Sequence, residues 1–237
     1  MAIHIMELSG MINNVVFYRR NGKNLARIKP RPYKRTKAMK LRSANFGIAS
    51  SGGRQLRKLL AGLIPFPENK SIQSKFSGAI YKWIGAREPS TIPAETNISW
   101  MTGFQLTDAI HFQNRWKARL DIIQASDGLL QLSIPAFKPV ESFTAPKGTV
   151  AVTLKVAVVS ILLAEIKDGK YFGHEMDFAF DNVETGPYQI NLPMSMERGR
   201  LILTACALQF HVKEGGSTVV ENARAFLPAE VMEARYC

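Results

Sequence analysis

The chain has 237 residues, 46% of them hydrophobic, which is enough to bury a sizeable core in one large domain or two small ones. Its net charge of +12 is uneven: residues 1–60 carry fourteen Lys and Arg against the single acid Glu7, whereas residues 61–237 carry seventeen bases and eighteen acids. Two cysteines exclude a disulfide framework, and the longest apolar run, 156–166, is too short for the roughly 20 residues of a transmembrane helix.

The opening residues, MAIHIMELSGMINNVVF, do not have the pattern of a secretory signal. They lack a positively charged start, an unbroken apolar core and a small-residue cleavage site. We therefore expect a cytoplasmic protein with no membrane partner, although a non-classical export route would leave no trace in the sequence.

Residues 13–42 contain eleven Lys or Arg and no acidic residue. Within them, Asn21-Gly22 lies between two apolar-rich runs and is typical of a β-hairpin, because both residues tolerate the positive φ of a type I′ turn. The pattern predicts strands over about 12–20 and 23–29, with Arg20 paired with Lys23. Alternation then places two sets of side chains on opposite faces. The cationic face holds Val16, Tyr18, Arg20, Lys23, Leu25 and Arg27, and the face expected to be packed holds Val15, Phe17, Ala26 and Ile28.

Helical spacing follows the hairpin and the extended segment KPRPYKR. Thr36 can cap a first helix, and the SSGG stretch at 50–53 is expected to interrupt it. Two further helical segments, 54–64 and 70–85, carry apolar stripes that we expect to pack in a core. The stripes are Leu56, Leu59, Leu60 and Leu63, and Ile72, Phe76, Ile80 and Trp83.

From about residue 95, short β-rich runs alternate with turns such as SDG, KDGK and EGGS. Roughly seven such strands without an intervening helical pattern are typical of an antiparallel immunoglobulin-like β-sandwich. The sequence thus predicts an α+β protein with a basic hairpin and helices over 1–94, a linker near 86–95 and a β-sandwich over 95–237. The strand side chains expected to be buried are Trp116, Leu120, Val152, Leu154, Leu203 and Ala205.

No group of residues indicates catalysis. The four histidines are scattered without the spacing of a metal site, so we expect no metal and no cofactor. Cys206 lies in the middle of an apolar strand and fits a small core residue. Glu175 and Asp177 share one face of a strand, where such carboxylates are usually solvated. These features predict a protein that is not an enzyme.

The segment from Ser9 to Ser50 resembles a pattern in an uncharacterised family of Bacteroidetes proteins, whose members continue into a β-rich domain. The family implies no activity and no catalytic residue. One departure is MINN at 11–14, where members often have a second glycine. The matching positions are Gly10, Val15, Val16, Gly22, Arg27, Pro30, Thr36, Arg42 and Phe46.

The basic segment has two specific interpretations, beside that of a solvated surface without a role. In the first, the protein is an assembly or interaction module that docks on an acidic protein surface or on a neighbouring copy. In the second, the segment binds the backbone of DNA or RNA, with Tyr18 and Tyr33 as stacking surfaces. In both interpretations, the residues that contact the partner or nucleic acid are Arg20, Lys23, Arg27, Arg31, Lys34 and Arg35.

Overall fold

The computed structural model describes residues 9–31, 34–63, 70–85, 87, 91–92, 98–107, 110–124, 129–163, 165, 168–194 and 197–237. The chain forms two compact units, residues 1–40 and 41–237. Helices and antiparallel sheets are both present, so the predicted α+β class is confirmed. The predicted linker at 86–95 and the division after residue 94 fall largely outside the described residues and stay predictions.

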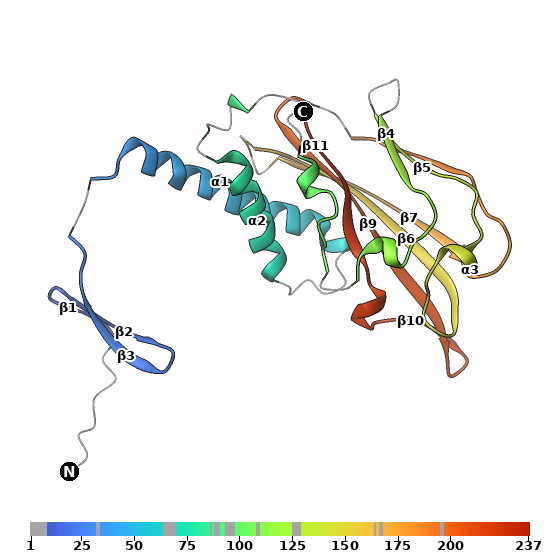
Figure 1. Ribbon diagram of the computed structural model, residues 1–237, viewed down its shortest axis with the longest axis horizontal. Helices are drawn as coiled ribbons and strands as arrows, with labels where there is room; N and C mark the ends of the chain where they lie inside the picture. The colour runs from blue at the N-terminus through green and yellow to red at the C-terminus, as the bar shows by residue number, and fades with distance from the viewer. Residues whose placement is uncertain are drawn as a thin grey trace, which may run out of the picture. The chain divides into compact units, whose positions relative to one another are not determined.

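The first unit contains a three-stranded antiparallel sheet with the order β1 (Gly10–Ile12), β2 (Val15–Arg20) and β3 (Lys23–Ile28) (Figure 1). Asn21 and Gly22 have the expected positive φ values of 51° and 76°, and Arg20 pairs with Lys23 as predicted. The prediction of one strand over 12–20 is wrong, because Asn13, with a φ of 53°, starts a second turn. Asn tolerates this left-handed conformation, so β1 folds back on β2.

The expected packed face of this sheet is not packed within the unit. Val15 and Phe17 are half-buried, Ala26 is exposed, and 73% of the Ile28 surface is exposed. None of the described residues between 9 and 40 is buried. The sheet therefore has a formed register, and the described residues of this unit form no core around it.

Helix α1 (Lys37–Leu59) begins at the predicted cap, where Thr36 Oγ1 accepts a hydrogen bond of 3.3 Å from the Met39 amide. The predicted break at 50–53 is wrong, because α1 continues through SSGG to a 3-10 helix at Leu60–Gly62. Gly52 and Gly53 are buried, and a Cβ at Gly53 would lie 2.8 Å from the backbone nitrogen of Ser77. The glycines thus let helix α2 (Lys70–Ile84) approach α1 closely.

The second unit is built on two antiparallel sheets. The larger has the order β10 (Ser217–Val220), β9 (Arg200–Glu214), β6 (Thr149–Leu162) and β7 (Gly169–Ala179), and β11 (Ala229–Tyr236) also pairs with β9. The smaller has the order β4 (Asp121–Gln124), β5 (Leu130–Ile134) and β8 (Tyr188–Leu192). Short helices lie at Ser99–Met101, Phe112–Asn114, Pro139–Ser142 (α3) and Arg224–Phe226.

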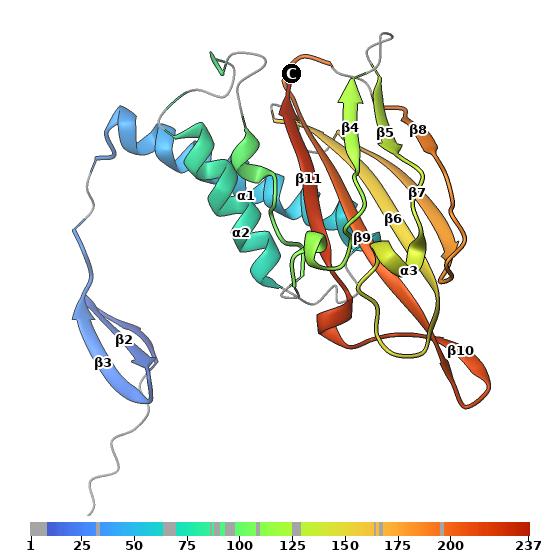
Figure 2. The same cartoon turned by 45° about the vertical axis from the view of Figure 1, so that its right-hand side comes forward.

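The large sheet is the middle layer of this unit, with α1 and α2 on one face and the small sheet on the other (Figure 2). Ala157 and Val159 of β6 pack with the helices, whereas Val156 and Val158 pack with the small sheet. Burial on both faces explains why the β6 sequence is almost continuously apolar instead of alternating.

Most of the side chains that the sequence predicts to be buried are buried in the structure. Predicted helix residues such as Leu56, Phe76 and Ile80 are in the core, and Leu59 packs against it. Of the six strand residues, Leu120 is only half-buried, and the other five are buried: Trp116, Val152, Leu154, Leu203 and Ala205. Within the described part of the chain, no helix has the length and apolar character needed to cross a membrane.

Candidate functional site

Three of the predicted site residues come together on one face of the N-terminal sheet. The register pairs Arg20 with Lys23 and Val16 with Arg27, so that all three cations point to the same side. Tyr18 shares this face, and the guanidinium carbon of Arg27 lies 5.6 Å from the centre of its ring. A cation and an aromatic ring are in the range of a cation–π contact at this distance.

The other three predicted cations lie in the segment that leads from β3 to α1. Arg31, Lys34 and Arg35 are exposed, and no helix or strand includes them. The first turn of α1 has no acidic residue and begins with Lys37. Positive charge at a helix N-terminus opposes the helix dipole, so this charge does not serve to stabilise the helix.

These cations are not neutralised within the described structure. The ion pairs among the described residues include none of Arg20, Lys23, Arg27, Arg31, Lys34 and Arg35. Their charge is therefore available to a ligand or partner that contacts the unit.

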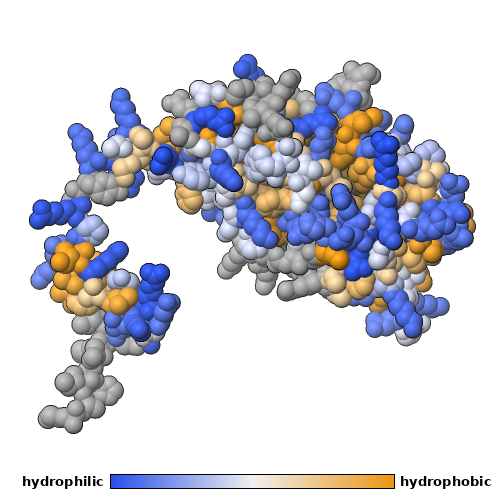
Figure 3. Space-filling model, viewed as in Figure 1, coloured by the Kyte–Doolittle hydropathy of each residue, from blue (hydrophilic) through white to orange (hydrophobic). Residues whose placement is uncertain are grey.

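The opposite face of the sheet is apolar except next to the β2–β3 turn, where the exposed Arg19 pairs with the exposed Asn24. Cross-strand pairing places Ile12 and Ile28 on either side of Val15, with Phe17 and Ala26 beside them. Ile12 is 52% exposed and Ile28 is 73% exposed. Figure 3 shows hydrophobic and strongly hydrophilic surface side by side on this small unit. Sequence reasoning found both faces, but it assumed that the chain itself would cover the apolar one.

A row of polar side chains crosses the large sheet of the second unit. Thr153 Oγ1 donates to Asp177 Oδ1 at 2.5 Å and lies 2.8 Å from His211 Nε2. Because the hydroxyl proton is directed to the carboxylate, Nε2 of His211 must be the donor to the hydroxyl oxygen. A histidine that donates in this way cannot take the hydroxyl proton, so His211 is not the base of a nucleophile–base pair with Thr153. The neighbouring Glu175 forms an ion pair of 3.2 Å with Lys155.

A hollow of about 150 Å³ lies beside this row. Its polar lining residues include Lys155, Gln209 and Asn222, and its apolar lining includes Leu63 and Leu227. Among the described residues, no buried polar atom without a hydrogen-bond partner lines the hollow. It therefore gives no indication of a ligand.

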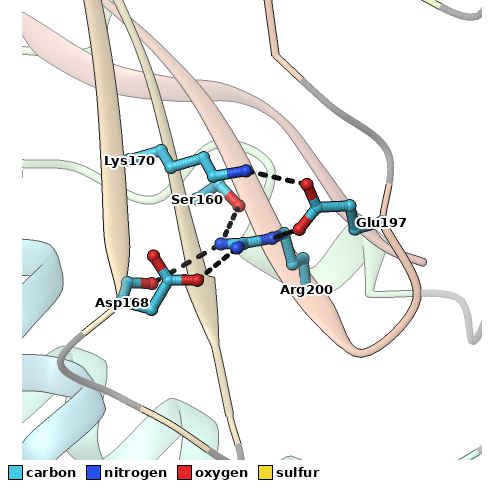
Figure 4. A network of polar contacts seen from close by, with 5 residues as sticks. All are labelled: Ser160, Asp168, Lys170, Glu197 and Arg200. Atoms are coloured by element: carbon cyan, nitrogen blue, oxygen red, sulfur yellow. Dashed lines mark hydrogen bonds and ion pairs between the residues drawn. The ribbon is translucent and has the colours of Figure 1, made fainter.

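A buried arginine joins the ends of three strands (Figure 4). Arg200 on β9 donates to Glu197 Oε2 at 2.5 Å and to Asp168, and its Nη1 lies 3.5 Å from Ser160 Oγ on β6. Lys170 on β7 donates to the other oxygen of Glu197 at 2.8 Å. Burial lowers the pKa of Arg200, but the hydrogen bonds to Glu197 and Asp168 outweigh it and raise this pKa. The two cations and two carboxylates of this network balance in charge. The network is best explained as a structural link between the strand ends.

The remaining candidate residues have structural surroundings. His111 Nδ1 lies 3.2 Å from Oε2 of the buried Glu230, which also accepts the Phe112 amide at 3.0 Å. Cys206 is fully buried, as the sequence indicated, and burial raises the pKa of its thiol. His4 lies outside the described residues. In the described ranges, no three His, Cys, Asp or Glu side chains are grouped as metal ligands would be.

Comparison of the chain with protein-family models, curated proteins and solved structures found no match. The resemblance to the Bacteroidetes family stays a prediction.

Proposed function

We propose that this protein is a non-catalytic assembly or interaction module whose N-terminal unit docks on another protein. The observation that carries the proposal is the two-faced sheet formed by β1, β2 and β3. It has one largely apolar and one cationic face, and none of its described residues is buried. A small sheet needs a covered apolar face for stability, and docking on a partner would cover it.

Charge supports an acidic partner over a neighbouring copy. Residues 1–40 carry ten Lys and Arg against Glu7, a net charge of +9, and residues 41–237 carry the remaining +3. A second copy therefore offers no excess of negative charge to the N-terminal unit. An acidic protein surface would complement it and steer the encounter.

We also propose that the two sheets of the second unit form an immunoglobulin-like sandwich. The chain crosses between the sheets after β5, after β7 and after β8, which gives the orders β4-β5-β8 and β10-β9-β6-β7. This Greek-key order of seven strands supports the proposal. In such a protein the sandwich would serve as the scaffold that carries the docking unit, in a cytoplasmic setting.

Nucleic-acid backbone binding is the alternative function. It is favoured by the aromatic ring of Tyr18 on the cationic face, since bases stack on such rings and phosphates pair with the cations around them. It does not account for the exposed apolar face. Tyr33, the second predicted stacking residue, lies outside the described residues.

The test compares two variants of equal charge. One replaces the six predicted contact cations by Ala: Arg20, Lys23, Arg27, Arg31, Lys34 and Arg35. The control replaces six exposed cations of the second unit: Arg54, Lys58, Lys82, Lys117, Lys147 and Lys213. Titration with poly-glutamate, a simple acidic polypeptide, is read by light scattering. We expect binding to be lost in the first variant and kept in the control. Equal binding by both variants would contradict the proposed docking unit.

A third variant tests the apolar face. Ile28→Ser changes the most exposed of its large side chains, and Leu25→Ser on the cationic face, 39% exposed, is the matched control. Neither side chain is buried, so the thermal stability of both variants should equal that of the wild type. We expect Ile28→Ser to weaken binding of a glutamate–tyrosine copolymer, whose rings can cover an apolar face, and Leu25→Ser to weaken it less. Equal binding of the copolymer by both variants would remove the apolar face from the proposal.

A further inference from the structure

One edge of the large sheet is open. Strand β7 pairs with β6 over eleven residues, Gly169–Ala179, without a register shift. Among the described residues, no second strand pairs with β7. The outer edge of β7 therefore presents a row of backbone N–H and C=O groups that another strand could pair with.

The opposite edge of the same sheet is protected in three ways. Strand β10 is only four residues long, and β11 has a register shift between Val231 and Glu233. The segment before residue 107 also covers β11, because the Gly103 amide donates to the Val231 carbonyl at 2.8 Å and the Val231 amide donates to the Phe104 carbonyl at 3.0 Å. Short strands, bulges and covering segments are the usual means of preventing edge-to-edge association.

In the ranges that the structure describes, strand β7 has none of these protections. Its sequence, GKYFGHEMDFA, contains no proline, and its pairing with β6 contains no bulge. The one lysine, Lys170, lies at the end of the strand and is paired with Glu197 at 2.8 Å. The contrast between the two edges indicates that the edge of β7 is suited to pair with another strand.

We propose that β7 pairs antiparallel with β7 of a second copy, around a two-fold axis at His174. His174 is the midpoint of Gly169–Ala179, so this register uses all eleven residues. It would place Tyr171 opposite Asp177, and Phe172 opposite Met176 of the other copy. Such pairs suit a strand that is complementary to itself, as a two-fold interface requires.

Charges and helices are compatible with this register. Glu175 would lie opposite Gly173, so the carboxylates of the two strands would not face one another. The end of α1 lies over the start of β7, where a Cβ on Gly169 would meet the side chains of Gln55 and Leu59. The two-fold axis would place the helix of the second copy over the opposite end of the pair, away from the first. The inference does not depend on the N-terminal docking unit.

The first experiment measures the mass of the full chain by size-exclusion chromatography with light scattering at micromolar concentration. We expect a dimer. His174→Lys would bring two ammonium groups together at the axis and should weaken dimerisation roughly fivefold. His174→Thr, which favours a strand and adds no charge, should keep the dimer. A monomeric wild type, or equal masses for both variants, would overturn the proposal.

The second experiment locates the contact. His174→Cys is made in a Cys237→Ser background and treated with a short bismaleimide; Cys206 is buried and does not compete. Crosslinked dimers are expected, and the exposed control Ser217→Cys on β10 should give none. Crosslinking only in the control would overturn the proposed edge. The variant without the six basic residues should still dimerise, so failure of this inference and failure of the docking function are distinguishable.

Discussion

The closest approach of the two helices gives a sharp prediction about stability. In Gly53→Ala, the new Cβ would lie 2.8 Å from the Ser77 nitrogen and 3.0 Å from the Gln73 carbonyl oxygen, both backbone atoms of α2. Ordinary Cβ contacts begin at 3.4 Å, so the helices must separate by about 0.6 Å. Such overpacking lowers the free energy of unfolding by about 1–3 kcal/mol, and the better helix propensity of Ala raises it by about 1 kcal/mol. We expect a net loss of up to about 2 kcal/mol.

The matched control is Gly47→Ala in the same helix. Gly47 is exposed, and no atom lies within 4 Å of the position of its Cβ. This variant should gain about 0.5–1 kcal/mol. Urea unfolding of both variants measures the difference, and the corresponding melting temperatures should move in opposite directions by roughly 2–4 °C per kcal/mol. If Gly53→Ala is as stable as Gly47→Ala, the close helix contact is refuted.

Two further predictions concern buried groups. Arg200→Ala removes the 3%-exposed arginine that joins three strands and should lower the free energy of unfolding by about 2–4 kcal/mol. The control Arg119→Ala breaks a surface ion pair with Asp121 and should change this free energy by less than about 1 kcal/mol. Similar losses for the two variants in urea unfolding would contradict the structural role of Arg200. Burial raises the pKa of Cys206, so its thiol stays protonated at about pH 8. Iodoacetamide should therefore label only Cys237 in the folded chain, and both cysteines in the unfolded chain. Labelling of Cys206 in the folded protein, detected by mass spectrometry, would show that this strand is not buried.

Local patterns predicted the local elements. The Asn21-Gly22 turn and the cap at Thr36 depend on residues close in sequence, and both are present. The strand β1 was missed because three residues carry too little periodicity to indicate a strand. The SSGG stretch was misread because glycine has two roles: it ends helices, and it also allows backbones to approach. Which role applies depended on Gln73 and Ser77 of α2, which lie 20 and 24 residues away from Gly53.

Features that depend on distant partners were not predictable. Arg200 meets Ser160 and Asp168 only because β6, β7 and β9 end together, and no spacing in the sequence indicates this. The apolar face of the N-terminal sheet was correctly found by alternation. Alternation shows which side chains share a face, but it does not show what covers the face, and none of the described residues of the unit covers this one.

The central claim is that the N-terminal unit docks on an acidic protein surface, and a comparison of two polyanions tests it most directly. The full chain is titrated with a glutamate–tyrosine copolymer and with duplex DNA over a salt series. Binding to DNA, which depends on the exposed cations alone, should fall steeply with salt and be absent at about 150 mM. Binding to the copolymer should persist there, because its aromatic rings can cover the apolar face, and burial of apolar surface is not screened by salt. Retention of DNA but not of the copolymer at that salt concentration would contradict the docking account and favour a nucleic-acid-binding protein.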